Sequence, residues 1–119
     1  FFNAYITKIP NDKKIKIDNF KNHYENNLKK ILQLENLYKS KVIFVTQTIS
    51  KDHWLNKYLN QVNELTVNYC IKNKLTCFNL HKKIDFDQEN DFYDGIHTTP
   101  SGSRKIGENI ASYFNNYFK

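Results

Sequence analysis

Two side chains near the end of the sequence could act together in proton transfer. Asp94 and His97 are three residues apart, so the carboxylate can reach the imidazole within a single turn. An aspartate that accepts the Nδ1 proton fixes the imidazole tautomer and leaves Nε2 free to act as a base. The same spacing also occurs in helix caps and surface hydrogen bonds. The residues around this candidate acid–base pair must therefore show whether it is catalytic or structural.

The sequence offers no evident nucleophile for such a base. Its serines lack the strand-to-loop setting of an activated nucleophile: Ser40, Ser50, Ser101, Ser103 and Ser112. His23, His53 and His81 could join the pair in a zinc site, since imidazole and carboxylate suit that metal. They show no HxxxH or HExxH spacing, so we expect exposed polar histidines, no metal and no cofactor.

The elements that must position the pair alternate between helices and strands. Residues 18–39 have apolar side chains at helical intervals, and Asp18 could cap the start of that helix. Residues 42–46 form a continuous β-branched and aromatic run, which is typical of a strand covered on both faces. A second amphipathic helix over 58–73 and a second strand over 75–80 complete a βαβ unit. The predicted fold class is α/β with a parallel sheet.

The last third of the chain predicts a loop and then a helix. Residues 81–99 lack a periodic pattern, and Thr99 before Pro100 is a typical helix start, followed by a helix that closes the chain. Residues 8–17 predict an exposed loop. Two strands do not form a stable sheet alone, so we expect Phe1 to Ile6 to end or follow another strand and further strands to precede residue 1. The domain is therefore expected to be incomplete at its N-terminal side.

The segment from Asp94 to Gly102 resembles the DxxHxxxxG block of the SGNH (GDSL-like) hydrolases, in which the loop opens into the C-terminal helix. Each fixed position of the block has its counterpart, including the glycine in the helix. The run 42–47 and the order of helix, strand, loop and helix are similar in layout. The resemblance implies a three-layer α/β/α fold with a flavodoxin-like parallel sheet, of which residues 1–119 are the C-terminal portion of a single domain.

The resemblance also implies an activity. In that family the block supplies two members of a Ser-His-Asp triad, so Asp94 would orient the imidazole and His97 would be the general base of a serine esterase. The family's Gly-Asp-Ser motif is absent, so the chain alone is expected to be inactive, with an upstream segment or another chain supplying the serine. One alternative is an O-acyltransferase acting on carbohydrate. Another is a non-catalytic binding or structural domain in which the pair only secures the helix start.

Two further residues are candidates for the same site. Asn3, in Phe1-Phe2-Asn3-Ala4, partly resembles the family's Gly-x-Asn-Asp block and could donate an amide N–H to an oxyanion, although the glycine and aspartate are missing. A turn residue is the alternative for Asn3. Trp54 follows the end of the first predicted strand, where α/β proteins form their sites, and could line an acyl or sugar pocket with Tyr58. Core packing is the alternative for Tyr58.

Charge and hydropathy restrict the partners. The net charge of +6 comes from lysines spread along the chain, with Arg104 as the only arginine, so it predicts a solvated surface and no nucleic-acid partner. The expected partner is a small-molecule or carbohydrate acyl ester. The longest strongly apolar run, 42–45, is far below the roughly 20 residues of a membrane-spanning helix, so no membrane span is expected.

The two cysteines do not form a recognisable framework. Cys70 and Cys77 lack CxxC spacing and have apolar neighbours, which predicts buried free thiols. A disulfide between them would require their Cα atoms to come within roughly 7 Å. The cysteines therefore indicate no cellular compartment.

Overall fold

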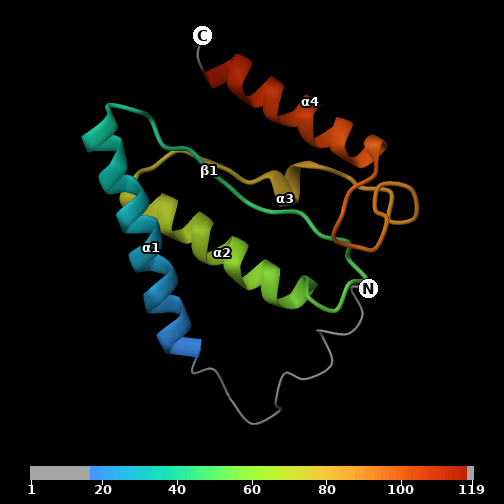
Figure 1. Ribbon diagram of the computed structural model, residues 1–119, viewed down its shortest axis with the longest axis horizontal. Helices are drawn as coiled ribbons and strands as arrows, with labels where there is room; N and C mark the ends of the chain where they lie inside the picture. The colour runs from blue at the N-terminus through green and yellow to red at the C-terminus, as the bar shows by residue number, and fades with distance from the viewer. Residues whose placement is uncertain (1–16, 118–119) are drawn as a thin grey trace.

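The computed structural model describes residues 17–117, and Figure 1 shows how their elements are arranged. The elements follow one another as α1 (Ile17–Tyr38), β1 (Phe44–Val45), α2 (Asn56–Asn73), β2 (Cys77–Phe78), α3 (Leu80–Lys83) and α4 (Pro100–Tyr117). The predictions for Asn3, for the segment Phe1 to Ile6 and for the loop before residue 17 lie outside the described residues. None of the helices within 17–117 has the length and apolar character needed to cross a bilayer.

The three long helices lie close to where the periodicity predicted them. Helix α1 begins one residue before Asp18, which therefore lies inside its first turn. Helix α2 begins at Asn56 and ends at Asn73. The next residue, Lys74, adopts the left-handed conformation (φ 53°) and donates its N–H to the carbonyls of Cys70 and Ile71. Helix α4 begins at Pro100 as predicted. The loop predicted over 81–99 instead starts within the short helix α3.

The two strands are parallel and shorter than predicted. Phe44 pairs with Cys77 and Val45 with Phe78, and hydrogen bonds from Phe44 N to Thr76 O (3.3 Å) and from Thr46 N to Phe78 O (3.1 Å) hold them together. Within the described residues each strand has a neighbour on one side only, and the ladder contains two residue pairs. The α/β class is confirmed, and the wider three-layer sheet stays a prediction.

Helices α1 and α2 cover one face of this sheet. Because side chains alternate along a strand, Phe44 and Cys77 share that face. Leu28 of α1, Phe44 of β1 and Cys70 of α2 form the buried cluster, and burying each large apolar side chain stabilises the fold by about 1.5–3 kcal/mol. Partly buried residues surround it: Tyr24, Leu32, Val42, Tyr69, Leu75 and Cys77.

Helix α4 lies on the opposite side of the strands (Figure 1). Tyr113 stacks on Phe78 with ring centroids 4.3 Å apart, and the hydroxyls of Tyr117 and Thr76 share a hydrogen bond of 3.0 Å. Val45 projects from the same face as Phe78, yet it is 38% exposed whereas Phe78 is 5% exposed. Helix α4 therefore covers β2 and leaves this face of β1 open.

The prediction of free thiols is wrong, because Cys70 and Cys77 form a disulfide. The left-handed Lys74 reverses the chain, and Leu75 N donates to Cys70 O over 2.9 Å. Strand β2 consequently begins beside the last turn of α2, and the two Cα atoms come to 6.0 Å. The disulfide joins α2 to the sheet on the face that carries the core.

Removing this disulfide should destabilise the fold measurably. The bond closes a loop with a sequence separation of 7, and the loss of such a loop from the unfolded chain corresponds to about 2 kcal/mol. The double variant Cys70→Ala/Cys77→Ala should lower the free energy of unfolding in urea by that amount. Dithiothreitol should lower the stability of the wild type and leave the variant unchanged; equal stabilities of both proteins without reductant would contradict the prediction.

Candidate active site

The loop between α3 and α4 carries the candidate pair and lies where the chain leaves the strands. Figure 1 shows this loop beside the segment that follows β1, and Ser50 N donates to Gly95 O over 2.8 Å. An antiparallel bridge pairs Phe92 with Thr98, and Tyr93 N donates to His97 O over 2.8 Å. The residues between them form a tight turn at the C-terminal ends of the strands, the usual position of sites in α/β proteins.

Asp94 and His97 contact each other in this turn. Nδ1 of His97 lies 2.6 Å from Oδ2 of Asp94, and Oδ1 accepts the backbone N–H groups of Ile96 (3.0 Å) and His97 (2.8 Å). The backbone N–H of His97, its imidazole and the N–H of Ile96 hold the pKa of Asp94 well below its usual range. The carboxylate is therefore ionised at neutral pH and fixes the imidazole through Nδ1.

The outer side of the imidazole is open. The side chain of His97 is 75% exposed and that of Asp94 is 54% exposed. Nε2 of His97 has no hydrogen-bond partner among residues 17–117. The contact predicted from the spacing is therefore present, and the second ring nitrogen points away from the carboxylate on the exposed side of the ring.

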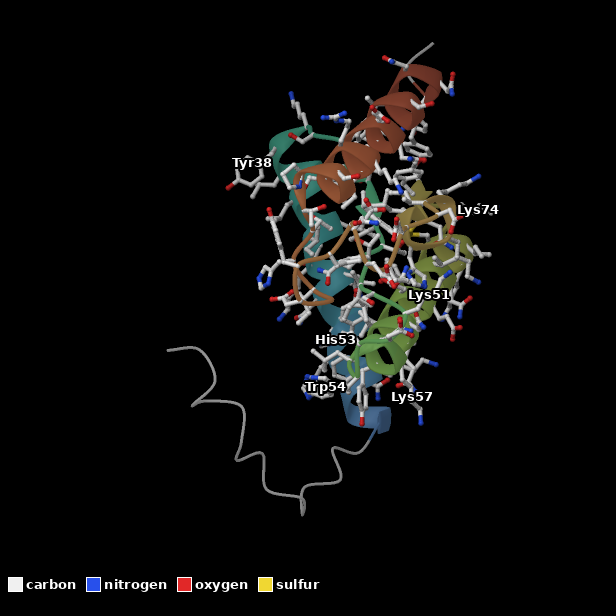
Figure 2. All side chains as sticks on the ribbon, turned by 90° about the vertical axis from the view of Figure 1, so that its right-hand side faces the viewer. Tyr38, Lys51, His53, Trp54, Lys57 and Lys74 are labelled. Carbon is white, nitrogen blue, oxygen red and sulfur yellow. A yellow bond between two sulfur atoms is a disulfide. The ribbon has the colours of Figure 1, made fainter. Side chains whose placement is uncertain are left out.

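Trp54 lies near this turn, because the preceding residue, His53, contacts it. The ring of His53 packs against Gly95, and the Trp54 ring lies 5.9 Å from the His53 ring, centroid to centroid. Figure 2 shows both side chains at the same end of the molecule. Trp54 is 60% exposed, so its ring forms open surface, and Tyr58 is 59% exposed, so the core-packing alternative for Tyr58 is wrong. His53 was expected to be an exposed polar residue, and it is instead half-buried.

An ion pair between a buried carboxylate and a partly exposed lysine anchors the loop to α4. Asp91 is 1% exposed, and its Oδ2 lies 2.6 Å from Nζ of Lys105 and accepts the N–H of Asp87 over 2.8 Å. Lys105 holds the pKa of Asp91 below its usual value, and Asp91 in turn raises the pKa of Lys105. No sequence pattern marks Asp91, because it lies in a loop without periodicity and its partner is one helical turn into α4.

The main chain of Asp91 fixes the start of the helix as well. Its carbonyl accepts Thr99 N over 3.0 Å, and the hydroxyl of Thr99 accepts Gly102 N over 3.3 Å, as the predicted N-cap requires. A Cβ on Gly102 would overlap the carbonyl oxygen of Asp91. The glycine that closes the DxxHxxxxG pattern is therefore needed for this close approach of helix and loop.

The described residues also form a pocket of about 260 Å³ beside α2 and α3. Its lining consists of Asn60, Asn63, Glu64, Val67, Asn68, Asn79, His81 and Lys82. Burial, followed by the charges of Lys82 and Lys51, lowers the pKa of His81. The lining includes no residue of the loop that carries the pair, so this pocket is separate from the candidate site. Within 17–117 no three His, Cys, Asp or Glu side chains group as metal ligands.

Two glycines of α4 provide a matched test of the helix–loop contact. Gly102→Ala should lower the free energy of unfolding by about 1–3 kcal/mol, because its Cβ would overlap backbone that cannot rotate away. Gly107→Ala should instead raise it by about 0.5–1 kcal/mol, because a Cβ at this exposed helical position meets nothing within 4 Å. Chemical denaturation of both variants measures the contrast, and equal effects would contradict the geometry.

The anchoring carboxylate should make the fold sensitive to acid. The folded-state pKa of Asp91 is below its ordinary value of 3.8, so its contribution to stability is present above about pH 4 and is lost as the pH falls through the folded-state pKa. The pKa of Lys105 is raised above 10.5, so its contribution is lost only in stronger base. Urea midpoints should fall between pH 5 and pH 3, and Asp91→Asn should reduce that fall while lowering the midpoint at pH 7.

Comparisons with known proteins identify a matching family and similar folds. The model of the family described as GDSL-like Lipase/Acylhydrolase matches residues 1–110. The esterase domain of the ZfL2-1 ORF1 protein from the zebrafish ZfL2-1 retrotransposon is a similar solved structure, with 15% identity, a TM-score of 0.67, and coverage of 81% of this chain and 60% of that one.

A putative acylhydrolase from Bacteroides fragilis NCTC 9343 is also similar, with 16% identity, a TM-score of 0.65, and coverage of 83% of this chain and 53% of that one. At these identities the two structures show the fold alone, and this chain spans 60% and 53% of their lengths. No curated protein matches the chain. The match over residues 1–110 shows that the chain belongs to the GDSL-like lipase/acylhydrolase family.

Proposed function

We propose that the chain supplies the acid and the base of a serine esterase with a Ser-His-Asp triad. One observation carries the proposal: Nδ1 of His97 is held 2.6 Å from Oδ2 of Asp94 while the other face of the ring is open, in a chain of the GDSL-like family. The segment from Asp94 to Gly102 would be the family's DxxHxxxxG block. The serine would come from an upstream segment or another chain.

The reaction would proceed through an acyl-serine. Nε2 of His97 takes the serine proton as the serine oxygen attacks the ester carbonyl carbon, and the protonated ring then gives that proton to the departing alcohol oxygen. Water attacks the acyl-serine in the second half, with His97 again as base, which releases the acid and restores the serine. Asp94 stays ionised throughout and stabilises the imidazolium through the Nδ1 hydrogen bond.

The open surfaces of the described residues support a larger domain. The imidazole is 75% exposed, and Val45 is 38% exposed on the strand that has a partner on only one side. Additional strands beyond β1 would complete a three-layer fold, in which residues 1–119 are the C-terminal portion, and would bring a serine toward Nε2. Asn3 is retained as the proposed oxyanion donor, although it lies outside the described residues.

An O-acyltransferase acting on carbohydrate is the second candidate. It shares every step up to the acyl-serine and differs in whether a sugar hydroxyl or water attacks next. The exposed ring of Trp54, one residue from the His53 that contacts Gly95, favours keeping this candidate because it offers an uncovered aromatic face beside the site. Product analysis with and without a carbohydrate acceptor separates the two activities.

Hydrolysis of p-nitrophenyl acetate by the protein together with its serine-bearing segment tests the proposal. His97→Ala should lower kcat by a factor on the order of 10³ or more, and Asp94→Asn should lower it by a similar or smaller factor through misorientation of the ring. His81→Ala, at a half-buried histidine of the separate pocket, is the control and should keep the rate. The 119-residue chain alone should not exceed free imidazole. Near-normal rates in His97→Ala would instead support the non-catalytic alternative.

A further inference from the structure

The ring of His53 occupies the space above Gly95. Gly95 has a φ of +83°, in the left-handed region that favours glycine, and a Cβ built on it would lie 2.9 Å from Cδ2 and 3.3 Å from Cγ of His53. Gly95 is the residue between Asp94 and the N–H groups that bind its carboxylate. The imidazole therefore packs directly on the turn that holds the candidate pair.

His53 is itself held in place. Leu55 N donates to its Nδ1 over 3.2 Å, so Nδ1 is the acceptor and the neutral ring carries its proton on Nε2. His53 N donates to Ser50 O over 3.2 Å, and Asn56 N donates to His53 O over 2.9 Å. The ring thus belongs to the turn that starts α2, and it lies near both Gly95 and the indole of Trp54.

A second contact links the same two segments. Ser50 N donates to Gly95 O over 2.8 Å, and Ser50 is 6% exposed. The hydroxyl of Ser50 (2.9 Å) and the N–H of Lys51 (2.7 Å) both donate to Oε1 of Gln88, in the loop that carries the pair. The hydrogen bond to the carbonyl of Gly95 and the packing of the His53 ring against its Cα together restrict how the turn can tilt against the sheet.

We propose that His53 is a positioning residue, which fixes the orientation of the turn from Asp94 to His97 and so directs Nε2 of His97 toward the nucleophile. The direction of Nε2 toward a nucleophile rests on the proposed function, whereas the orientation of the turn does not. A purely structural role would be different: Nδ1 of His53 would only accept the N–H of Leu55, just before α2. The two roles use different atoms, because the contact with Gly95 is made by ring and Cβ carbons.

Two substitutions separate these roles. His53→Phe keeps a flat ring over Gly95 and removes the acceptor for Leu55 N. His53→Ala removes both the ring and the acceptor. The positioning role predicts that the phenylalanine variant keeps the wild-type orientation of the turn and that the alanine variant loses it. A role confined to the Leu55 hydrogen bond predicts that the two variants behave alike, because both lack the acceptor.

Amide hydrogen exchange followed by NMR in the 119-residue chain tests this without any activity. The N–H of Ser50 donates to Gly95 O, so its exchange rate reports whether the turn keeps its place against the segment after β1. His53→Ala should speed exchange of the Ser50 amide several-fold, and His53→Phe should leave it at the wild-type rate. His81→Ala, in the separate pocket, is the matched control and should leave the exchange of Ser50 unchanged. Backbone amide spectra report whether each variant keeps its fold.

Kinetics of the protein with its serine-bearing segment complete the test. His53→Ala should lower kcat by about 10- to 100-fold with KM nearly unchanged, as expected for a misdirected base, and His53→Phe should stay within a few-fold of wild type. Unchanged Ser50 exchange in His53→Ala, or equal changes in both variants, would overturn the positioning role. If the exchange of Ser50 changes as expected while His97→Ala keeps full activity, the proposed function fails and the positioning of the turn stands.

Discussion

A carboxylate taken almost completely out of water requires a cation beside it, and Asp91 has the ammonium group of Lys105 at 2.6 Å. The same residue accepts Asp87 N with its carboxylate and Thr99 N with its main-chain carbonyl. Asp91 therefore joins the beginning of its loop, the end of that loop and the first turns of α4. Removing the cation would leave a buried charge unpaired, and the geometry of the turn that carries Asp94 would lose its support on that side.

Polar side chains take over where the short strands end. The hydroxyl of Thr46 accepts His81 N (2.9 Å) and donates to Oδ1 of Asn79 (3.2 Å), which joins the residues after β1 to those after β2. Asn63 of α2, 5% exposed, accepts Gln47 N and donates to Gln47 O, as a neighbouring strand would. These bonds satisfy the backbone beyond β1 without extending the sheet. The chain is thereby led toward Ser50 and its bond to Gly95.

The sequence was informative wherever contacts are local. Helical periodicity located α1, α2 and α4, because a stripe such as the one through Leu28 reflects burial of one helix face. The Thr99 cap and the contact between Asp94 and His97 also depend on residues within three or four positions. The α/β class followed from the order of helices and strands.

Features that join distant residues could not be predicted in this way. The length of a strand depends on its neighbours in space, so the two-residue β1 and β2 could not be derived from apolar runs. The disulfide depends on the left-handed conformation of Lys74, and residue propensities do not indicate that conformation for a lysine. The packing of His53 on Gly95 joins residues 42 positions apart, and nothing in the sequence around either residue indicates this contact. Likewise, no sequence feature of the loop aspartate Asp91 indicates that it forms an ion pair with Lys105.

The three hydrogen bonds of Asp94 all end within its own four-residue turn, on Ile96 and on the backbone and ring of His97. Contacts between residues so close in sequence form with little loss of chain entropy. The position of the turn against the rest of the fold instead requires segments more than 40 residues apart to meet. The internal geometry of the pair and its placement are therefore separate properties of the molecule. Evolution or design can re-aim this pair as a rigid unit by altering its supports, without rebuilding the bond between carboxylate and imidazole.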